Sequence, residues 1–168
     1  LGRSVVAQLG RTLGGSSAIN GFNYVRGQAQ DYDDWAAQGA QGWSYAEVLP
    51  YFKRSEQRLA ACDANYRGLD GELPITDCDW RHPLCDAFIA GAASQGIPSG
   101  RDYNAARQEG AGYYQRWIHR GWRVSAATAF LKPAKGRRNL KVIPHAQVTR
   151  LLLEQARAVG VEYAADAS

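Results

Sequence analysis

A glycine- and serine-rich stretch, residues 10–21, has the residue types and spacing that best fit ligand chemistry in this sequence. Within it, Gly14 and Gly15 precede Ser16 and Ser17. Glycine lets a backbone approach a ligand closely and adopt a positive φ angle. A serine at the start of a helix can cap it, and the free N–H groups there attract anions. The stretch therefore predicts a phosphate or pyrophosphate cradle that opens onto a helix, with a capped turn lacking any ligand as the alternative.

The other residue types that often do chemistry form no clear constellation. The three histidines are interpreted as structural or surface imidazoles: His82, His119 and His145. Three cysteines are an odd count without a Cys-x-x-Cys pair, which favours free thiols in a reducing compartment over a disulfide framework. Cys78, His82 and Cys85 lack the spacing of a standard zinc site and a fourth ligand, so we expect no metal.

Composition places the chain among ordinary globular proteins. It has 168 residues, 45% of them hydrophobic and 21% charged, and a net charge of +4. Its arginines are scattered, which argues against a nucleic-acid-binding patch, and no apolar run approaches the length of a membrane span. We therefore expect a cytoplasmic protein, with peripheral membrane association left open. The chain contains no Met and opens on Leu1, so it is expected to be an internal fragment of a longer protein.

The residues after the glycine-rich stretch carry a family resemblance. Residues 10–33 resemble, without a gap, the flavin-binding signature of the glucose–methanol–choline (GMC) oxidoreductases, especially their choline- and alcohol-dehydrogenase-like members. The match continues in looser form to Glu56, and residues 71–163 resemble later elements of the family in the same order. This resemblance implies a flavoprotein that binds FAD.

The resemblance also implies positions that contact the cofactor. They are Ser16, Asn20, Gly21 and Asn23 near the flavin or its phosphates, Gly14 and Gly15 in the turn beside the pyrophosphate, and Val148 at the adenine. A helix-capping amide is the alternative for Asn20, and an ordinary strand residue the alternative for Val148. Some relatives carry a histidine, covalently linked to the flavin, where this chain has Ile19, so the resemblance implies non-covalent FAD.

The function implied is a part of an FAD-dependent oxidoreductase that oxidises an alcohol, choline-like or another primary alcohol, by hydride transfer to the flavin. The electron acceptor and the identity of the alcohol stay open. The family's Gly-x-Gly-x-x-Gly unit is absent, and its catalytic histidine pair lies beyond residue 168, so no catalytic residue is assigned. The alternatives are a truncated, catalytically inactive remnant with a structural or binding role, and a generic phosphate-binding domain.

The expected fold is mixed α/β: part of a GMC-type FAD-binding domain with part of the substrate-binding domain. Residues 1–58 are assigned to the FAD-binding domain, residues 59–131 to the substrate-binding domain, and residues 132–168 to strands that return to the FAD-binding domain.

Periodicity and turn signals predict the elements that must position these residues. The expected helices are Ser16 to about Val25, Asp31–Ala37, a helix capped by Ser44 that runs to about Arg58, a helix from His82-Pro83 to Gly96, and Ser125–Leu131. The expected strands are 71–76, 112–118, 140–143, 148–153 and 158–163, the last two forming a hairpin that turns near Gln155. Residues 59–72 are predicted to form a surface connection. Four aromatic residues are interpreted as core rather than flavin lid: Tyr32, Trp35, Trp43 and Tyr45.

Overall fold

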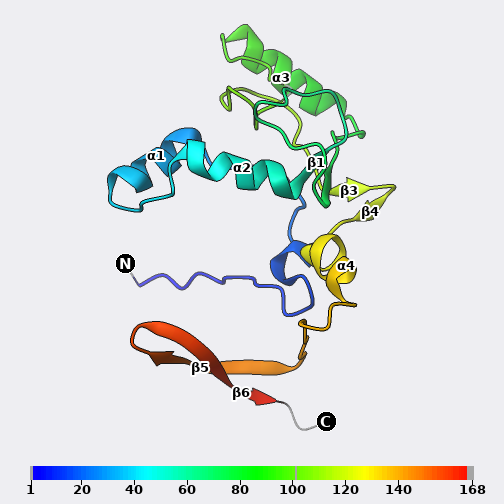
Figure 1. Ribbon diagram of the computed structural model, residues 1–168. Coiled ribbons are helices and arrows are strands. Elements are labelled where there is room, and N and C mark those ends of the chain that lie inside the picture. The colour runs from blue at the N-terminus through cyan, green and yellow to red at the C-terminus, as the bar shows by residue number, and fades with distance from the viewer. Residues whose placement is uncertain (1, 101, 166–168) are drawn as a thin grey trace. The chain divides into compact units, whose positions relative to one another are not determined.

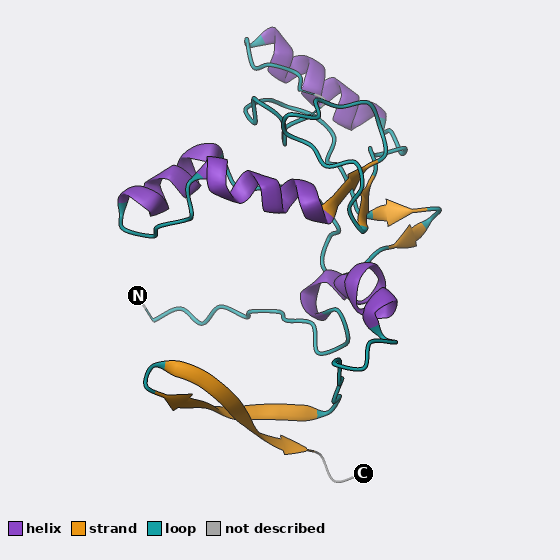
Figure 2. Ribbon diagram, viewed as in Figure 1, coloured by secondary structure: helices purple, strands orange, loops and turns teal. Residues whose placement is uncertain are grey.

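The computed structural model describes residues 2–100 and 102–165, and it confirms a mixture of helices and strands (Figures 1 and 2). The chain divides into two compact units, the first ending at Pro133 and the second beginning at Ala134. The helices are η1 Gly15–Ala18, α1 Ala29–Ala37, α2 Tyr45–Ser55, α3 Pro83–Ser94, η2 Ala127–Leu131 and α4 Lys132–Ala134. The strands are β1 Glu56–Arg58, β2 Leu73–Ile75, β3 Ile118–His119, β4 Trp122–Arg123, β5 Ala146–Glu154 and β6 Arg157–Ala165.

The prediction of a helix from Ser16 to about Val25 is wrong. The chain forms only a four-residue 3₁₀-helix, η1, and then a turn. The Asn20 side chain accepts a hydrogen bond from the backbone N–H of Phe22 (3.1 Å), and Phe22 has a φ of 50°. A local bond from an asparagine side chain competes with helix formation, and a positive φ at a non-glycine residue ends the helix.

The helix α2 confirms the cap that the sequence predicted at Ser44. In α2 the Glu47 carboxylate accepts a hydrogen bond from the Ser44 backbone N–H (3.1 Å), which completes a capping box. An equivalent box joins Gln28 and Asp31, so α1 begins two residues before the expected Asp31. The helix α2 ends at Ser55 rather than near Arg58, because the next three residues form β1.

The strand expected at 71–76 is confirmed as β2, which pairs in parallel with β1. The sequence predicted a surface connection at residues 59–72. The structure differs in part, because Arg67 within this segment is only 1% exposed. A Cβ added at Gly68 would lie 1.9 Å from the Lys53 carbonyl oxygen. This close backbone packing brings Arg67 inward against the end of α2.

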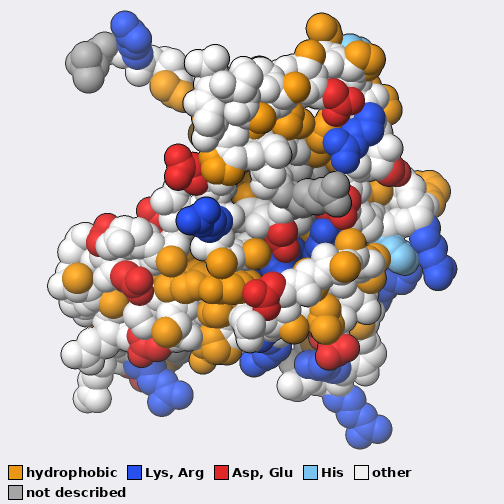
Figure 3. All heavy atoms as spheres, turned by 90° about the horizontal axis from the view of Figure 1, so that it is seen from above, with side chains coloured by type: hydrophobic (Ala, Val, Ile, Leu, Met, Phe, Trp, Pro, Cys, Tyr) orange, Lys and Arg blue, Asp and Glu red, His pale blue; other side chains and the backbone are white. Residues whose placement is uncertain are grey.

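The helix α3 begins with Pro83 at its first turn and is followed by Gly96 with a φ of 82°, as expected. Large apolar side chains on this helix are nevertheless open to solvent: Leu84 is 75% exposed and Phe88 is 73% exposed. Further hydrophobic side chains lie at the surface in Figure 3.

The long strand expected at 112–118 is wrong, since only Ile118 and His119 form β3, paired with β4. The residues before β3 satisfy their backbone groups on separate loops: Gln115 donates its N–H to the Tyr103 hydroxyl (2.6 Å), and its carbonyl accepts from the Tyr24 N–H (2.8 Å). A segment bonded in this way belongs to no regular ladder.

The helix expected at Ser125–Leu131 is present as the π-helical turn η2, but it continues through Pro133 into α4 instead of ending before that proline. Pro133 lies in the last turn of this continuous helical segment, which ends one residue later at Ala134.

In the second unit, β5 and β6 form the expected antiparallel hairpin. Gln155 and Ala156 at its turn have φ angles of 46° and 62°, the pattern of a two-residue primed turn. The strand expected at 140–143 is wrong, because these residues are irregular. Within the described part of the chain, no helix is both long and apolar enough to span a membrane.

Candidate functional site

The glycine turn is closed on one side and open on the other. Gly14 and Gly15 have φ angles of 92° and 56°, which confirms that this turn uses left-handed backbone. A Cβ at Gly10 would lie 2.3 Å from the Gly15 carbonyl oxygen, so the turn needs glycine there to close. A Cβ at Gly15 would meet no atom within 4 Å. The face beside Gly15 is therefore open for a ligand to approach the backbone.

The hydroxyl groups of Ser16 and Ser17 form hydrogen bonds that stabilise the turn. Ser16 Oγ accepts a hydrogen bond from the Gly10 N–H (3.2 Å). Ser17 Oγ donates to the Gly14 carbonyl (2.5 Å) and accepts from the Ala126 N–H (2.9 Å). Ser17 thus joins the turn to the start of η2. At four residues, η1 is too short for the helix-terminus anion site that the sequence suggested, so any ligand contact must come from the turn and the side chains around it.

Asn20 lies beside the turn and is held by Arg123 of β4. Arg123 Nη1 donates to Asn20 Oδ1 (3.1 Å) and to the Ser17 carbonyl (3.3 Å), and its guanidinium lies 4.8 Å from the centre of the Phe22 ring. The sequence analysis does not single out Arg123, because it falls within residues 59–131, which the family resemblance assigns to the substrate-binding domain.

The sequence-predicted positions from Gly14 to Asn23 lie on one continuous segment. Gly21 and Asn23 are exposed, and the Asn23 backbone forms an isolated bridge with Arg116. Val148 lies in β5 of the second unit, where it pairs with Tyr163 and is 50% exposed.

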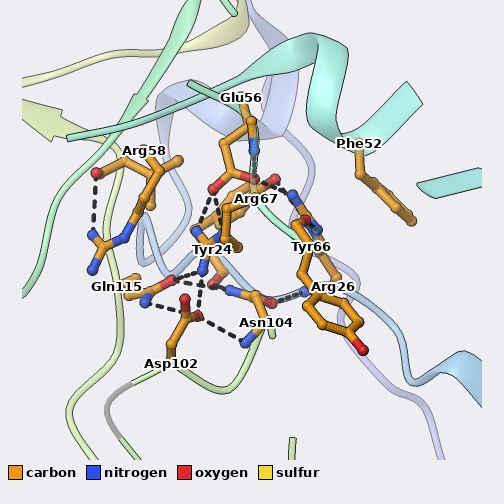
Figure 4. Close-up of polar contacts among 12 residues, drawn as sticks. Tyr24, Arg26, Phe52, Glu56, Arg58, Tyr66, Arg67, Asp102, Asn104 and Gln115 are labelled. Carbon is orange, nitrogen blue, oxygen red and sulfur yellow. Dashed lines mark hydrogen bonds and ion pairs between the residues drawn. The ribbon is translucent and has the colours of Figure 1, made fainter. Parts of the chain in front are cut away.

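A buried ionic network anchors the segment that follows these positions (Figure 4). Glu56 at the start of β1 is fully buried and forms ion pairs with both Arg26 and Arg67. Arg67 also pairs with Asp102 and donates to Gln115 Oε1 (2.9 Å). Two arginines thus face two carboxylates, which balances the buried charge. No sequence signal singled out this network, because its partners come from distant parts of the chain.

Amide and hydroxyl groups complete the anchoring of the backbone at Tyr24 and Arg26. Asn104 Oδ1 accepts from the Arg26 N–H (2.8 Å), and Asn104 Nδ2 donates to the Tyr24 carbonyl (3.1 Å). The Tyr103 hydroxyl donates to the same carbonyl (2.8 Å), and Gln108 Nε2 donates to the Arg26 carbonyl (2.7 Å). Side chains of Tyr103, Asn104 and Gln108 therefore hold the backbone of residues 24–26 in place through hydrogen bonds.

Burial shifts the titration of the groups around this segment. It raises the pKa of Tyr103 to about 12 and also raises the pKa of Tyr24. For Arg67, burial lowers the pKa, but the hydrogen bond and the charge of Glu56 outweigh burial and raise it overall. Arg67 therefore stays charged at neutral pH, and both tyrosines keep their protons.

An open pocket of about 1240 Å³ lies between residues 25–31 and residues 103–114. Tyr45, Tyr66 and Tyr114 contribute side chains to its lining. None of the cofactor-contact positions read from the sequence lines this pocket, so it is a separate feature from the glycine turn.

Five aromatic side chains form a cluster at α1 and α2: the four interpreted as core, Tyr32, Trp35, Trp43 and Tyr45, together with Phe52. The Tyr32 ring lies 5.4 Å from Trp35 and 5.7 Å from Phe52, and Trp35 lies 5.7 Å from Trp43. Trp35 and Trp43 remain 48% and 51% exposed. The cluster is therefore an interhelical contact whose outer half faces solvent.

Cys78 and His82 make local hydrogen bonds. Cys78 Sγ donates to the Trp80 carbonyl (3.1 Å), and His82 Nδ1 accepts from the Leu84 N–H (3.2 Å) as the cap of α3. All three cysteines are free thiols. Among the residues that the structure describes, no group of three or more His, Cys, Asp or Glu side chains could hold a metal ion.

Comparison with protein families matches residues 2–168 to the model of the GMC oxidoreductases. The chain is 47% identical over 167 residues to the oxygen-dependent choline dehydrogenase of Brucella anthropi, covering 99% of this chain and 30% of that protein. It is 46% identical over 163 residues to the mitochondrial choline dehydrogenase of Homo sapiens, covering 96% of this chain and 27% of that protein. The chain thus spans less than a third of the length of these relatives.

Solved structures share its fold. An FAD-dependent oxidoreductase from Chaetomium thermophilum superposes with a TM-score of 0.87 at 27% identity, covering 97% of this chain and 30% of that one. Pyridoxine 4-oxidase from Mesorbium loti superposes with a TM-score of 0.82 at 33% identity, covering 94% of this chain and 31% of that one.

Proposed function

Because this chain belongs to the GMC oxidoreductase family, we propose that it is part of an FAD-dependent enzyme that oxidises an alcohol. The family resemblance read from residues 10–56 and 71–163 is confirmed by the match over residues 2–168. That match is the observation that carries the proposal. The names of the relatives at 46–47% identity favour choline or a choline-like primary alcohol as the substrate.

The residues of the glycine turn fit the cofactor. Gly14 and Gly15 expose backbone in a left-handed turn with open space beside Gly15, and Ser16, Asn20, Gly21 and Asn23 follow on the same segment. These residues would hold the flavin or its phosphates, and Val148 would contribute its backbone at the adenine. Ile19 carries no nucleophile, so the FAD is held non-covalently.

When bound, FAD supplies a hydride acceptor: the carbinol carbon gives up its hydride, a base takes the hydroxyl proton, and the alcohol becomes an aldehyde. This chain's part in that chemistry is to bind and orient the cofactor. The base belongs to a part of the protein outside these residues. Residues 1–58 and 132–168 would form parts of the FAD-binding domain, and residues 59–131 part of the substrate-binding domain.

The free thiols of Cys62, Cys78 and Cys85 favour a reducing compartment, such as the cytoplasm.

The test uses the full-length protein that contains this sequence. We expect a flavin spectrum after purification, release of the flavin into solution by acid denaturation, and bleaching of the flavin band when choline is added without oxygen. Flavin that stays attached to denatured protein would contradict non-covalent binding. A purified protein without flavin that does not take up FAD would leave the inactive remnant as the better interpretation.

A further inference from the structure

The Asn20 side chain makes two hydrogen bonds, and both use its oxygen. Oδ1 accepts from the Phe22 backbone N–H (3.1 Å) and from Arg123 Nη1 (3.1 Å). A carboxamide oxygen only accepts hydrogen bonds, and its nitrogen only donates them. Turning the amide over would place the N–H groups of Nδ2 against two donors. The two partners therefore determine which end of the amide is which.

Arg123 is the stronger of these two constraints. Its guanidinium is always charged and cannot act as an acceptor, so it tolerates only an oxygen at this place. It is held there by the Ser17 carbonyl (3.3 Å) and by the ring of Phe22, which lies 4.8 Å away. Arg123 thus connects β4 to both ends of the turn between Ser17 and Phe22.

The opposite end of the amide is available to a ligand. Asn20 is exposed, and its Nδ2 makes no hydrogen bond within the described residues 2–100 and 102–165. An approaching molecule therefore meets two N–H donors, backed by the positive charge of Arg123. A group that accepts hydrogen bonds, such as a carbonyl, a ring nitrogen or a phosphate oxygen, fits this surface, whereas another donor does not.

We propose that Arg123 is a positioning residue that orients the Asn20 amide as a hydrogen-bond donor toward an acceptor atom of the flavin cofactor. The proposal rests on the proposed function, because it takes FAD as the ligand of the glycine turn. It adds a residue of β4 to the cofactor site and states the polarity of the contact.

The first experiment compares Asn20→Asp with Asn20→Ala in the full-length apoprotein, titrated with FAD and followed by flavin fluorescence. Asp accepts the same hydrogen bonds from Phe22 and Arg123, so its apoprotein should melt no lower than the wild type. It offers no donor, however, and presents an acceptor to an acceptor. We expect about tenfold weaker FAD binding for Asn20→Ala, as for the loss of one hydrogen bond, and weaker binding still for Asn20→Asp.

The second experiment tests whether Arg123 acts through Asn20. Arg123→Ala should weaken FAD binding about tenfold in the wild-type background but by less than about twofold in the Asn20→Ala background. Arg123→Lys keeps a donor and a charge and should restore part of the affinity. Arg120→Ala, in the neighbouring β3–β4 turn, is the matched control and should bind FAD as the wild type does.

The reduction potential of the bound flavin gives a second measurement. If the acceptor atom belongs to the flavin ring, this potential should become more negative in Arg123→Ala and stay unchanged in Arg120→Ala.

Failure of the two proposals looks different in these experiments. A wild-type protein that does not bind FAD would overturn the proposed function itself. A wild-type protein that binds FAD, with Asn20→Asp binding it as tightly as the wild type, would overturn the donor role of Asn20. Additive losses in Asn20→Ala and Arg123→Ala would overturn the positioning role of Arg123. An unchanged potential with a weakened affinity would move the acceptor from the ring to the phosphates.

Discussion

Gly14 and Gly15 share a left-handed backbone but differ in what surrounds them. A Cβ at Gly14 would lie 3.2 Å from Ala127, so a substitution there disturbs the packing of η2. A Cβ at Gly15 meets nothing within 4 Å. Gly15 therefore offers the cleaner test of whether the open side of the turn holds a cofactor.

We expect Gly15→Ala to weaken FAD binding by at least about tenfold while lowering the melting temperature only slightly. The added methyl group would occupy the space through which a ligand approaches the backbone, whereas the cost of a positive φ for alanine is only about 1–2 kcal/mol. Gly39→Ala is the matched control, since Gly39 also has a positive φ, 103°, and open space around it. Equal FAD affinity in Gly15→Ala and Gly39→Ala would place the ligand elsewhere.

Glu56 is the residue on which the buried network depends, because it faces two arginines at once. Glu56→Gln should lower the free energy of unfolding by about 3–5 kcal/mol, since it leaves buried arginine charge uncompensated. Urea denaturation of the apoprotein measures this loss. Glu162→Gln removes the exposed pair with Arg150, and it should cost no more than about 1 kcal/mol. Similar losses in both variants would contradict the importance of burial.

Tyr103 gives the network a dependence on alkaline pH. Burial raises its pKa to about 12 in the folded protein, whereas the unfolded chain loses this proton near pH 10. Between these values the folded state binds more protons, so stability is fully present below about pH 10 and falls as the pH rises toward 12. In Tyr103→Phe the decline between pH 10 and 12 should be shallower, though not absent, because the pKa values of Tyr24 and Tyr45 are also raised. Denaturant titrations at several pH values measure the slope, and parallel curves for wild type and variant would contradict this assignment.

At the scale of elements, the sequence predicted best what depends on neighbouring residues. The capping box at Ser44, the proline start of α3 and the β5–β6 hairpin all rest on side chains within a few positions of one another. The helix after Ser16 failed because the bond of the Asn20 side chain to the backbone outweighed a favourable local pattern. The strand at 112–118 failed because its backbone partners, Tyr24 and Tyr103, come from other loops.

The same distinction between neighbouring and distant residues applies to the candidate site. Gly14 to Asn23 could be predicted as cofactor contacts because they form one continuous stretch that resembles a family signature. Arg123 and Asn20 are 103 positions apart, and Arg67 and Gln115 are 48 apart. No periodicity or spacing rule reports such a pair, so these contacts required the structure.

The β5–β6 turn allows a test of one element by itself. Ala156 has a φ of 62°, a conformation that glycine adopts more readily than alanine. Ala156→Gly should therefore stabilise the hairpin by up to about 1 kcal/mol, seen as slower amide hydrogen exchange along β5 and β6. Ala158→Gly, within β6, should have the opposite effect, because glycine weakens a strand interior. Faster exchange in Ala156→Gly would contradict the turn geometry.

At the scale of the whole molecule, the described residues bury more polar than apolar side chains. Among the described residues the buried hydrophobic side chains are Tyr24, Ile75 and Ala129, together with Pro74, whereas seven polar or charged residues are buried. Large apolar side chains remain exposed on α3 and on the hairpin, such as Phe88 at 73% and Leu153 at 62%. The interior of the described residues is therefore mainly polar and centred on the network around Glu56, with only a small hydrophobic core.

This balance predicts the heat capacity of unfolding. Unfolding raises the heat capacity mainly by exposing apolar surface to water, and globular proteins average about 12–15 cal/mol/K per residue. The 168-residue chain studied alone should fall clearly below that range in scanning calorimetry, whereas the full-length protein should lie within it. Because self-association would also bury apolar surface, the measurement is repeated at several protein concentrations. A normal, concentration-independent value for the chain alone would mean that its exposed apolar side chains pack together in solution, which would contradict a mainly polar interior.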